Sequence, residues 1–217
     1  MGNQLPMTRH HREVELVPQQ QPVAAVGASY CSPQSTLLQI THHPTMPSRF
    51  IVRDPKTGLV CFHKERISKL STRQTLMNVR DDSSNKVAVA NAKNATFTSK
   101  FQVRAGASKD GDELFQVYAK VKMQTSELVA DFMDLATGER CLMGLKGHWR
   151  CHQGYLWLDR GATGTREPVV NIWLDEKVQQ REVYSLEIAP NVDVAMVLVV
   201  CMILDERWRT SISHTDS

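Results

Sequence analysis

The chain has no apolar run long enough to cross a membrane. The longest one, Val194 to Leu204, has eleven residues and lies between two carboxylates, Asp193 and Asp205. A bilayer core is roughly 30 Å thick and needs about 20 apolar residues in a helix, whereas eleven helical residues span only about 17 Å. We therefore predict no transmembrane segment.

Signals for secretion and for nucleic-acid binding are also missing. The N-terminus shows no basic segment followed by an apolar core, so we expect no secretory signal. The five cysteines are odd in number and widely spaced, which is typical of reduced thiols. The net charge of +3 is too small to indicate a nucleic-acid partner by itself. We expect a cytoplasmic monomer, with a peripheral-membrane or nuclear location as alternatives.

The sequence contains none of the common catalytic fingerprints. There is no G-x-S-x-G elbow, P-loop, dinucleotide glycine motif or H-E-x-x-H pair. The segment "CLMGLKGHWRCH" gathers Cys141, His148, Cys151 and His152, but only the last two are close, and adjacent strand residues point to opposite faces. His42, beside His43, is expected to be a solvated tail residue. We predict a protein that is not an enzyme and has no cofactor and no metal site.

What the chain does contain is a long series of short strands. Between residues 49 and 190, alternating segments of apolar and polar residues are separated by turn signals such as Asp110-Gly111. An additional strand is expected just before this region. The predicted strands are residues 34–42, 49–54, 59–64, 75–81, 86–92, 97–105, 113–122, 126–135, 139–146, 153–160, 168–175 and 181–189.

The terminal apolar run is expected to be a helix inside a barrel. Asn191 is a good N-cap, and Asp193 suits the positive end of a helix dipole. Twelve antiparallel strands have two edges unless the sheet closes. A barrel of that size leaves an interior that an all-apolar helix of about 16 residues would fill. The tryptophans of the last strands, Trp149 among them, are expected to pack in the wall and core.

Composition changes near residue 48. Six of the nine prolines precede it, and "PQQQP" at 18–22 is of low complexity. We predict a disordered tail over residues 1–33, a barrel domain over residues 34–207, and a short polar tail over residues 208–217.

The C-terminal motif resembles that of a known family. The pattern "YSLEIAPNVDVAMVLVVCMILDE", together with the strand hairpins, is similar to the LURP-one-related proteins of the tubby C-terminal-like superfamily. The residues that match are Tyr184, Leu186, Ile188, Ala189, Pro190, Val192, Asp193, Ala195, Leu204, Asp205 and Glu206. The family usually has Gly where Asn191 stands, and Asn tolerates a similar backbone. The resemblance covers residues 36–207. It implies a closed barrel of about twelve strands around a C-terminal helix, with kinship to phosphoinositide-binding tubby proteins and to phospholipid scramblases.

The best candidate site from sequence is electrostatic. If Gln102 pairs with Gln116 in the hairpin 98–122, one outward face collects cations and a tyrosine, with no acid among them. We call it the basic face, and it consists of Lys100, Arg104, Tyr118, Lys120 and Lys122. Such a face would bind anionic phospholipid head groups, phosphoinositides included. Two alternatives stay open, a merely solvated barrel exterior and a protein-interaction scaffold without lipid binding.

Overall fold

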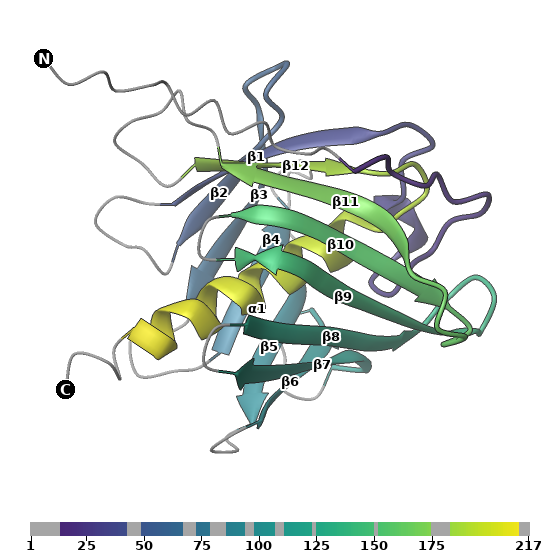
Figure 1. Cartoon of the computed structure of the whole chain (residues 1–217). Coiled ribbons are helices and arrows are strands. Elements are labelled where there is room, and N and C mark those ends of the chain that lie inside the picture. The colour runs from purple at the N-terminus through teal and green to yellow at the C-terminus, as the bar shows by residue number, and fades with distance from the viewer. Residues whose placement is uncertain are drawn as a thin grey trace, which may run out of the picture.

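Twelve antiparallel strands close into a barrel around one long helix. The computed structural model describes residues 14–42, 49–66, 73–78, 86–93, 98–106, 111–122, 125–149, 152–174 and 183–212. Each strand pairs with the next along the chain, and β1 closes the ring against β12 (Figure 1). The elements are η1 (Ala28–Tyr30), β1 (Thr36–His42), β2 (Phe50–Arg53), β3 (Val60–Arg66), β4 (Arg73–Asn78), β5 (Lys86–Lys93), β6 (Thr98–Ala105), β7 (Glu113–Lys122), β8 (Thr125–Met133), β9 (Arg140–His148), β10 (Gln153–Arg160), β11 (Glu167–Leu174), β12 (Val183–Ile188) and α1 (Val194–Ile212).

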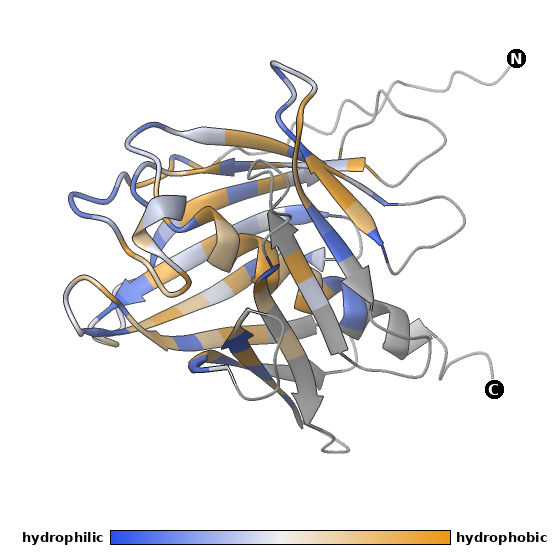
Figure 2. Ribbon diagram, turned by 180° about the vertical axis from the view of Figure 1, so that it is seen from behind, coloured by the Kyte–Doolittle hydropathy of each residue, from blue (hydrophilic) through white to orange (hydrophobic). Residues whose placement is uncertain are grey.

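Alternation along each strand explains why the sheet closes with one apolar side inward. In β7, Phe115 and Val117 are buried, while Gln116 and Tyr118 are half-buried on the outside. The same alternation appears as orange and blue or pale bands along the strands in Figure 2. The twelve predicted strands are confirmed, and 113–122 and 153–160 have the predicted boundaries. Closure removes both sheet edges, which would otherwise expose unpaired backbone groups.

The helix α1 runs through the barrel and fills it, as predicted. From Val194 to Leu204 every residue is buried, and Leu198 is 0% exposed. The helix has 19 residues, three more than expected, and continues beyond the buried part to Ile212. The predicted N-cap is wrong. Asp193 caps the helix, because its Oδ1 accepts the Met196 N–H at 3.0 Å, whereas Asn191 has a left-handed φ of 63° in the turn before it.

The N-terminal segment is ordered where the sequence predicted disorder. Residues 14–35, which we call the strap, cross the end of the barrel where α1 begins (Figure 1). Val23, Ala24 and Ala25 are at most 1% exposed, and Val23 forms a parallel bridge with Val192. The prediction for residues 1–33 is therefore wrong over 14–33, while residues 1–13 lie outside the described part of the chain. Small apolar side chains cover the end of the barrel here. They form no periodic pattern from which the sequence could have predicted their burial.

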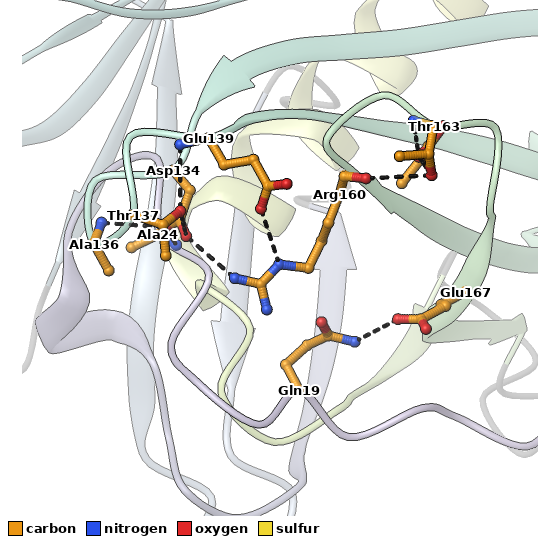
Figure 3. Close-up of polar contacts among 10 residues, drawn as sticks. Gln19, Ala24, Asp134, Ala136, Thr137, Glu139, Arg160, Thr163 and Glu167 are labelled. Atoms are coloured by element: carbon orange, nitrogen blue, oxygen red, sulfur yellow. Dashed lines mark hydrogen bonds and ion pairs between the residues drawn. The ribbon is translucent and has the colours of Figure 1, made fainter.

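Two hairpins of the barrel tie the strap down (Figure 3). Asp134, after β8, is 0% exposed and accepts the Ala24 N–H at 3.1 Å. Its other oxygen accepts from Thr137 at 2.8 Å and lies 3.4 Å from Arg160 on β10. Gln19 of the strap donates to Glu167 of β11 at 3.1 Å. These contacts give the buried carboxylate partners within the protein and fix the strap in place.

Candidate functional site

The basic face exists as an outward surface on β6 and β7. Gln102 pairs with Gln116, as the prediction required. Phe101 and Val103 are buried, so Lys100 and the other even-numbered residues of β6 point outward. The structure places the backbone of every predicted member on these two strands, but the side chains of Lys120 and Lys122 lie outside the described part.

One end of the basic face is neutralised by an acid. The register shifts between Val103 and Arg104, which brings Glu113 opposite Arg104. The guanidinium donates from Nη1 to the Gly111 carbonyl at 2.8 Å, and its Nη2 lies 3.9 Å from Glu113 Oε2. The expectation of a face without acid is therefore wrong at Glu113, because a bulge that the sequence pattern does not reveal reverses that residue's position.

Hydrogen bonds hold Glu113 in its ionised form. Gln116 and Gln102 both donate to its carboxylate, and Tyr118 donates to Gln116 Oε1 at 2.6 Å. The bond from Gln116 lowers the pKa of Glu113, and the bond from Gln102 and the charge of Arg104 add to that effect. This end of the face is an internally satisfied polar network.

At the other end of the basic face, the strand register brings backbone positions of lysines next to one another. Lys100 Nζ lies 5.3 Å from the centroid of the Tyr118 ring. The backbone register places Lys93 of β5 directly opposite Lys100 and Thr98 directly opposite Lys120. Lys93 thus extends the basic face onto β5, and we call Lys93, Lys100 and Lys120 the lysine end. Lys93 was not predicted, because the sequence does not reveal the register between β5 and β6. Like charges directly opposite each other destabilise a sheet unless an anion lies between them.

Acids follow on the next strand. Glu127 of β8 stands opposite Lys120. Asp131, also on β8, forms a bidentate pair with Arg140 of β9, with Nε and Nη2 at 3.0 and 2.7 Å from its oxygens. The outer surface from β5 to β9 thus passes from lysines to a mixed row of both charges.

A second polar cluster lies inside the barrel, near the end of the buried part of α1. Asp205 is 4% exposed. Its Oδ1 accepts the Trp149 Nε1–H at 3.1 Å, and its Oδ2 accepts from the Tyr184 hydroxyl at 3.4 Å. Nε2 of His42 lies 3.5 Å from Oδ2, and Nε2 of His152 lies 3.9 Å from Oδ1. We call His42, His152 and Asp205 the internal triad.

The charges around Asp205 keep it ionised despite its burial. Burial raises the pKa of this carboxyl, but interactions with His152, His42 and Lys64 outweigh burial and lower the pKa overall. Lys64 is itself 1% exposed, and its Nζ donates to the Met202 carbonyl at 3.5 Å. The helix thus carries a negative charge into the barrel among positive or protonatable groups from the wall.

The internal triad was not predicted, and one of its members was placed wrongly. His42 was expected to be solvated, yet it ends β1 and is 6% exposed. Its partners come from the turn before β10 and from α1, so no local spacing could have joined them. Of the segment that gathers Cys141, His148 and His152, Cys141 pairs with Arg160 at one end of β9 and the exposed His148 pairs with Gln153 at the other, while Cys151 lies outside the described part.

A closed barrel of twelve antiparallel strands around a C-terminal apolar helix is the fold class that these observations define. The chain belongs to the LURP-one-related family, whose model matches residues 36–205 and which is part of the tubby-like superfamily. No curated protein and no solved structure matches the chain. Among the described residues, no helix combines the length and apolar character needed to cross a membrane.

Proposed function

We propose that this barrel is a non-enzymatic module that docks on anionic phospholipid surfaces through the lysine end of its basic face and serves there as an adaptor. The observation that carries the proposal is the pairing of Lys93 with Lys100 across β5 and β6. Two opposed cations favour an anion between them. Kinship of the family with tubby proteins supports a phosphoinositide head group as that anion.

The two ends of the basic face differ in what they offer a phosphate. Arg104 already has a carbonyl and a carboxylate as partners, so binding a phosphate there would cost the loss of existing contacts. Lys100, by contrast, lies over the ring of Tyr118, beside the positions of Lys93 and Lys120. The lysine end is therefore the part of the predicted face that we assign to lipid.

Vesicle sedimentation tests the proposal. Vesicles of phosphatidylcholine with and without a phosphoinositide would be mixed with the protein at about 0.1 M salt, where screening is incomplete. A lysine near an anionic surface contributes about 1 kcal/mol. Changing Lys93, Lys100 and Lys120 to Gln should therefore weaken binding on the order of a hundredfold.

A charge-matched variant separates the lysine end from net charge. Changing Arg49, Lys56 and Arg104 to Gln removes the same charge. Arg49 and Lys56 are exposed and lie around β2, four strands away from β6, while the half-buried Arg104 is the paired cation at the other end of the basic face. This variant should bind within a few-fold of the unchanged protein. Equal loss in both variants would show that only net charge matters, and an unchanged protein that ignores the vesicles would overturn the lipid proposal.

A protein-interaction role is the second candidate, and the mixed row beside the lysines favours it. Glu127 and the Asp131–Arg140 pair give that surface both signs of charge, which suits a polar protein partner better than a uniformly anionic membrane. The same vesicle experiment divides the two candidates, since a scaffold without lipid binding would show no sedimentation with phosphoinositide and no response to salt.

A further inference from the structure

We infer that the internal triad is a binding site for one divalent transition-metal ion of the zinc type, held by His42, His152 and Asp205. The three side chains each offer one ligand atom, and these atoms all lie within 4.8 Å of one another. They come from β1, from the turn before β10 and from α1. This site is distinct from the basic face and does not depend on the proposed lipid docking.

The separations fit a shared ion better than direct hydrogen bonds. His42 Nε2 and His152 Nε2 lie 3.5 and 3.9 Å from the two oxygens of Asp205. Ordinary hydrogen bonds between nitrogen and oxygen span about 2.7–3.2 Å. Ligands about 2.0–2.2 Å from a zinc ion lie roughly 3.3–3.6 Å apart in a tetrahedron. Small side-chain rotations would bring all three atoms to that spacing.

The surroundings orient the ligands. The ring of His152 stacks on Tyr184, with centroids 4.3 Å apart and planes 11° apart, and it also meets Trp149 edge-on at 5.3 Å and His42 at 6.4 Å. His42 meets Phe50 at 5.9 Å in a perpendicular arrangement. These contacts limit how far either imidazole can turn, so only small rotations are needed when an ion binds. Metal-binding sites generally depend on such outer partners for affinity.

Hydrogen bonds also hold the carboxylate ligand. Trp149 donates to Oδ1 at 3.1 Å and Tyr184 to Oδ2 at 3.4 Å. These donors leave each oxygen a second lone-pair direction toward the imidazoles. A ligating carboxylate is commonly supported in this way.

The donor set selects the kind of ion. Two imidazoles and one carboxylate suit Zn²⁺ or Fe²⁺, whereas Ca²⁺ and Mg²⁺ prefer six or more oxygen ligands. Three protein ligands leave one tetrahedral position for water. Lys64 places a positive charge near Asp205, and this charge competes with a bound cation. The Lys64 ammonium also donates to the Met202 carbonyl, which supplies one of its hydrogen-bond partners.

The bound ion would clamp the helix to the wall. Asp205 belongs to α1, while His42 ends the strand that closes the barrel against β12. Metal coordination would join these elements directly, so loss of the ion should loosen this end of the helix while the strap end stays fixed.

Calorimetric titration with Zn²⁺ tests the inference on the full chain, freed of metal by a chelator and carrying no histidine tag. We expect one saturable site per chain at pH 7.5 and weaker binding at pH 5.5, because protons compete for imidazole nitrogens. At a hundredfold excess over Kd, Zn²⁺ should raise Tm by roughly 5–10 °C. Co²⁺ in the same site should give the intense visible absorption of tetrahedral coordination.

Single substitutions localise the site. His42→Gln and His152→Gln should each weaken Zn²⁺ binding more than about 100-fold, since even outer-shell losses cost about 10–100-fold. His148→Gln, on an exposed histidine, is the matched control and should change nothing. Lys64→Met should tighten binding by removing a competing positive charge. Where a ligand variant fails to fold, Trp149→Phe removes an outer donor and should weaken binding about tenfold.

Two results would overturn the inference. One is equal Zn²⁺ binding in the unchanged protein, in His42→Gln and in His152→Gln, which would place the metal elsewhere, for example on the histidines of the N-terminal tail. The other is no binding of Zn²⁺ or Co²⁺ at all, which would show that the internal triad is a cluster of ion pairs and not a metal site.

Discussion

The two ends of the buried helix each carry an aspartate, and the two carboxylates are held by different kinds of partner. Asp193 accepts backbone N–H groups of Ala25, Val26 and Gly27 at 3.1, 2.8 and 3.1 Å. It also caps the helix through Met196. Asp205 has no such set among the described residues, where it contacts side chains of the barrel wall instead.

The two ends of the helix therefore differ in kind. We call the Asp193 end the lock, because its contacts are fixed, and the Asp205 end the adjustable site, because its contacts can change. Backbone N–H groups cannot change charge or turn away without local unfolding, so the Asp193 end joins the strap to the helix permanently. The partners of Asp205 are side chains, and the imidazoles among them can bind an ion, so the Asp205 end can respond to its surroundings. The pKa values differ in direction accordingly, because burial raises that of Asp193 while charged neighbours lower that of Asp205.

Removing the strap should cause the largest loss of stability. Deletion of residues 1–33 exposes the barrel end that Val23 and Ala25 seal and leaves Asp193 without three of its donors. We expect a loss of about 5 kcal/mol or more, which corresponds to a fall in Tm of at least 10 °C or so. Thermal unfolding followed by circular dichroism measures it.

Deletion of residues 1–13 alone is the control for the strap. It keeps every described contact of residues 14–35 and should leave Tm almost unchanged. Equal Tm values for both deletions would show that the strap contributes nothing, and the lock at the Asp193 end would then be wrong.

Asp193→Ala should have the next largest effect. It leaves four backbone donors without their acceptor at a position that is 0% exposed, and a buried donor without a partner costs about 1–3 kcal/mol. We expect a loss of about 3–5 kcal/mol in urea unfolding. Asp193→Asn keeps one acceptor oxygen and should lose less than the alanine variant, so a larger loss with Asn would contradict the hydrogen-bond explanation.

The sequence predicted the barrel because strand patterning is local. Each alternating segment reports its own inward and outward faces, and the apolar run at 194–204 had to be surrounded by protein. The strap escaped prediction because Val23, Ala24 and Ala25 form no periodic pattern and are recognisable only by what they cover. Proline-rich, polar composition around them indicated disorder, yet tertiary contacts decided the outcome.

The candidate sites show the same division between local and long-range information. The outward face of β6 and β7 could be predicted from alternation. Glu113 belongs to this face because of a bulge, and Lys93 lies beside it because of the strand register, and neither feature could be predicted. The internal triad joins His42 to Asp205 across more than 160 residues of sequence, and only the closure of the barrel brings them together. Contacts of that kind have no signature within a single segment.

The smallest expected effect is a difference in pH dependence between Asp205→Asn and Asp193→Asn, measured by urea unfolding with a chelator present. The folded-state pKa of Asp205 is lowered, so its contribution is present above the ordinary carboxyl pKa of about 3.9 and is lost as pH falls through the folded-state value. The stability gap between the unchanged protein and Asp205→Asn should therefore be widest at pH 5–7 and narrow below about pH 4.

The folded-state pKa of Asp193 is raised, so its proton-linked contribution is present at low pH and is lost as pH rises through that value. The gap for Asp193→Asn should widen as pH falls. The effect of each should be on the order of 1 kcal/mol across this range. Gaps that change in the same direction for both variants would show that the two ends of the helix are electrostatically alike, and the distinction between a lock and an adjustable site would fail.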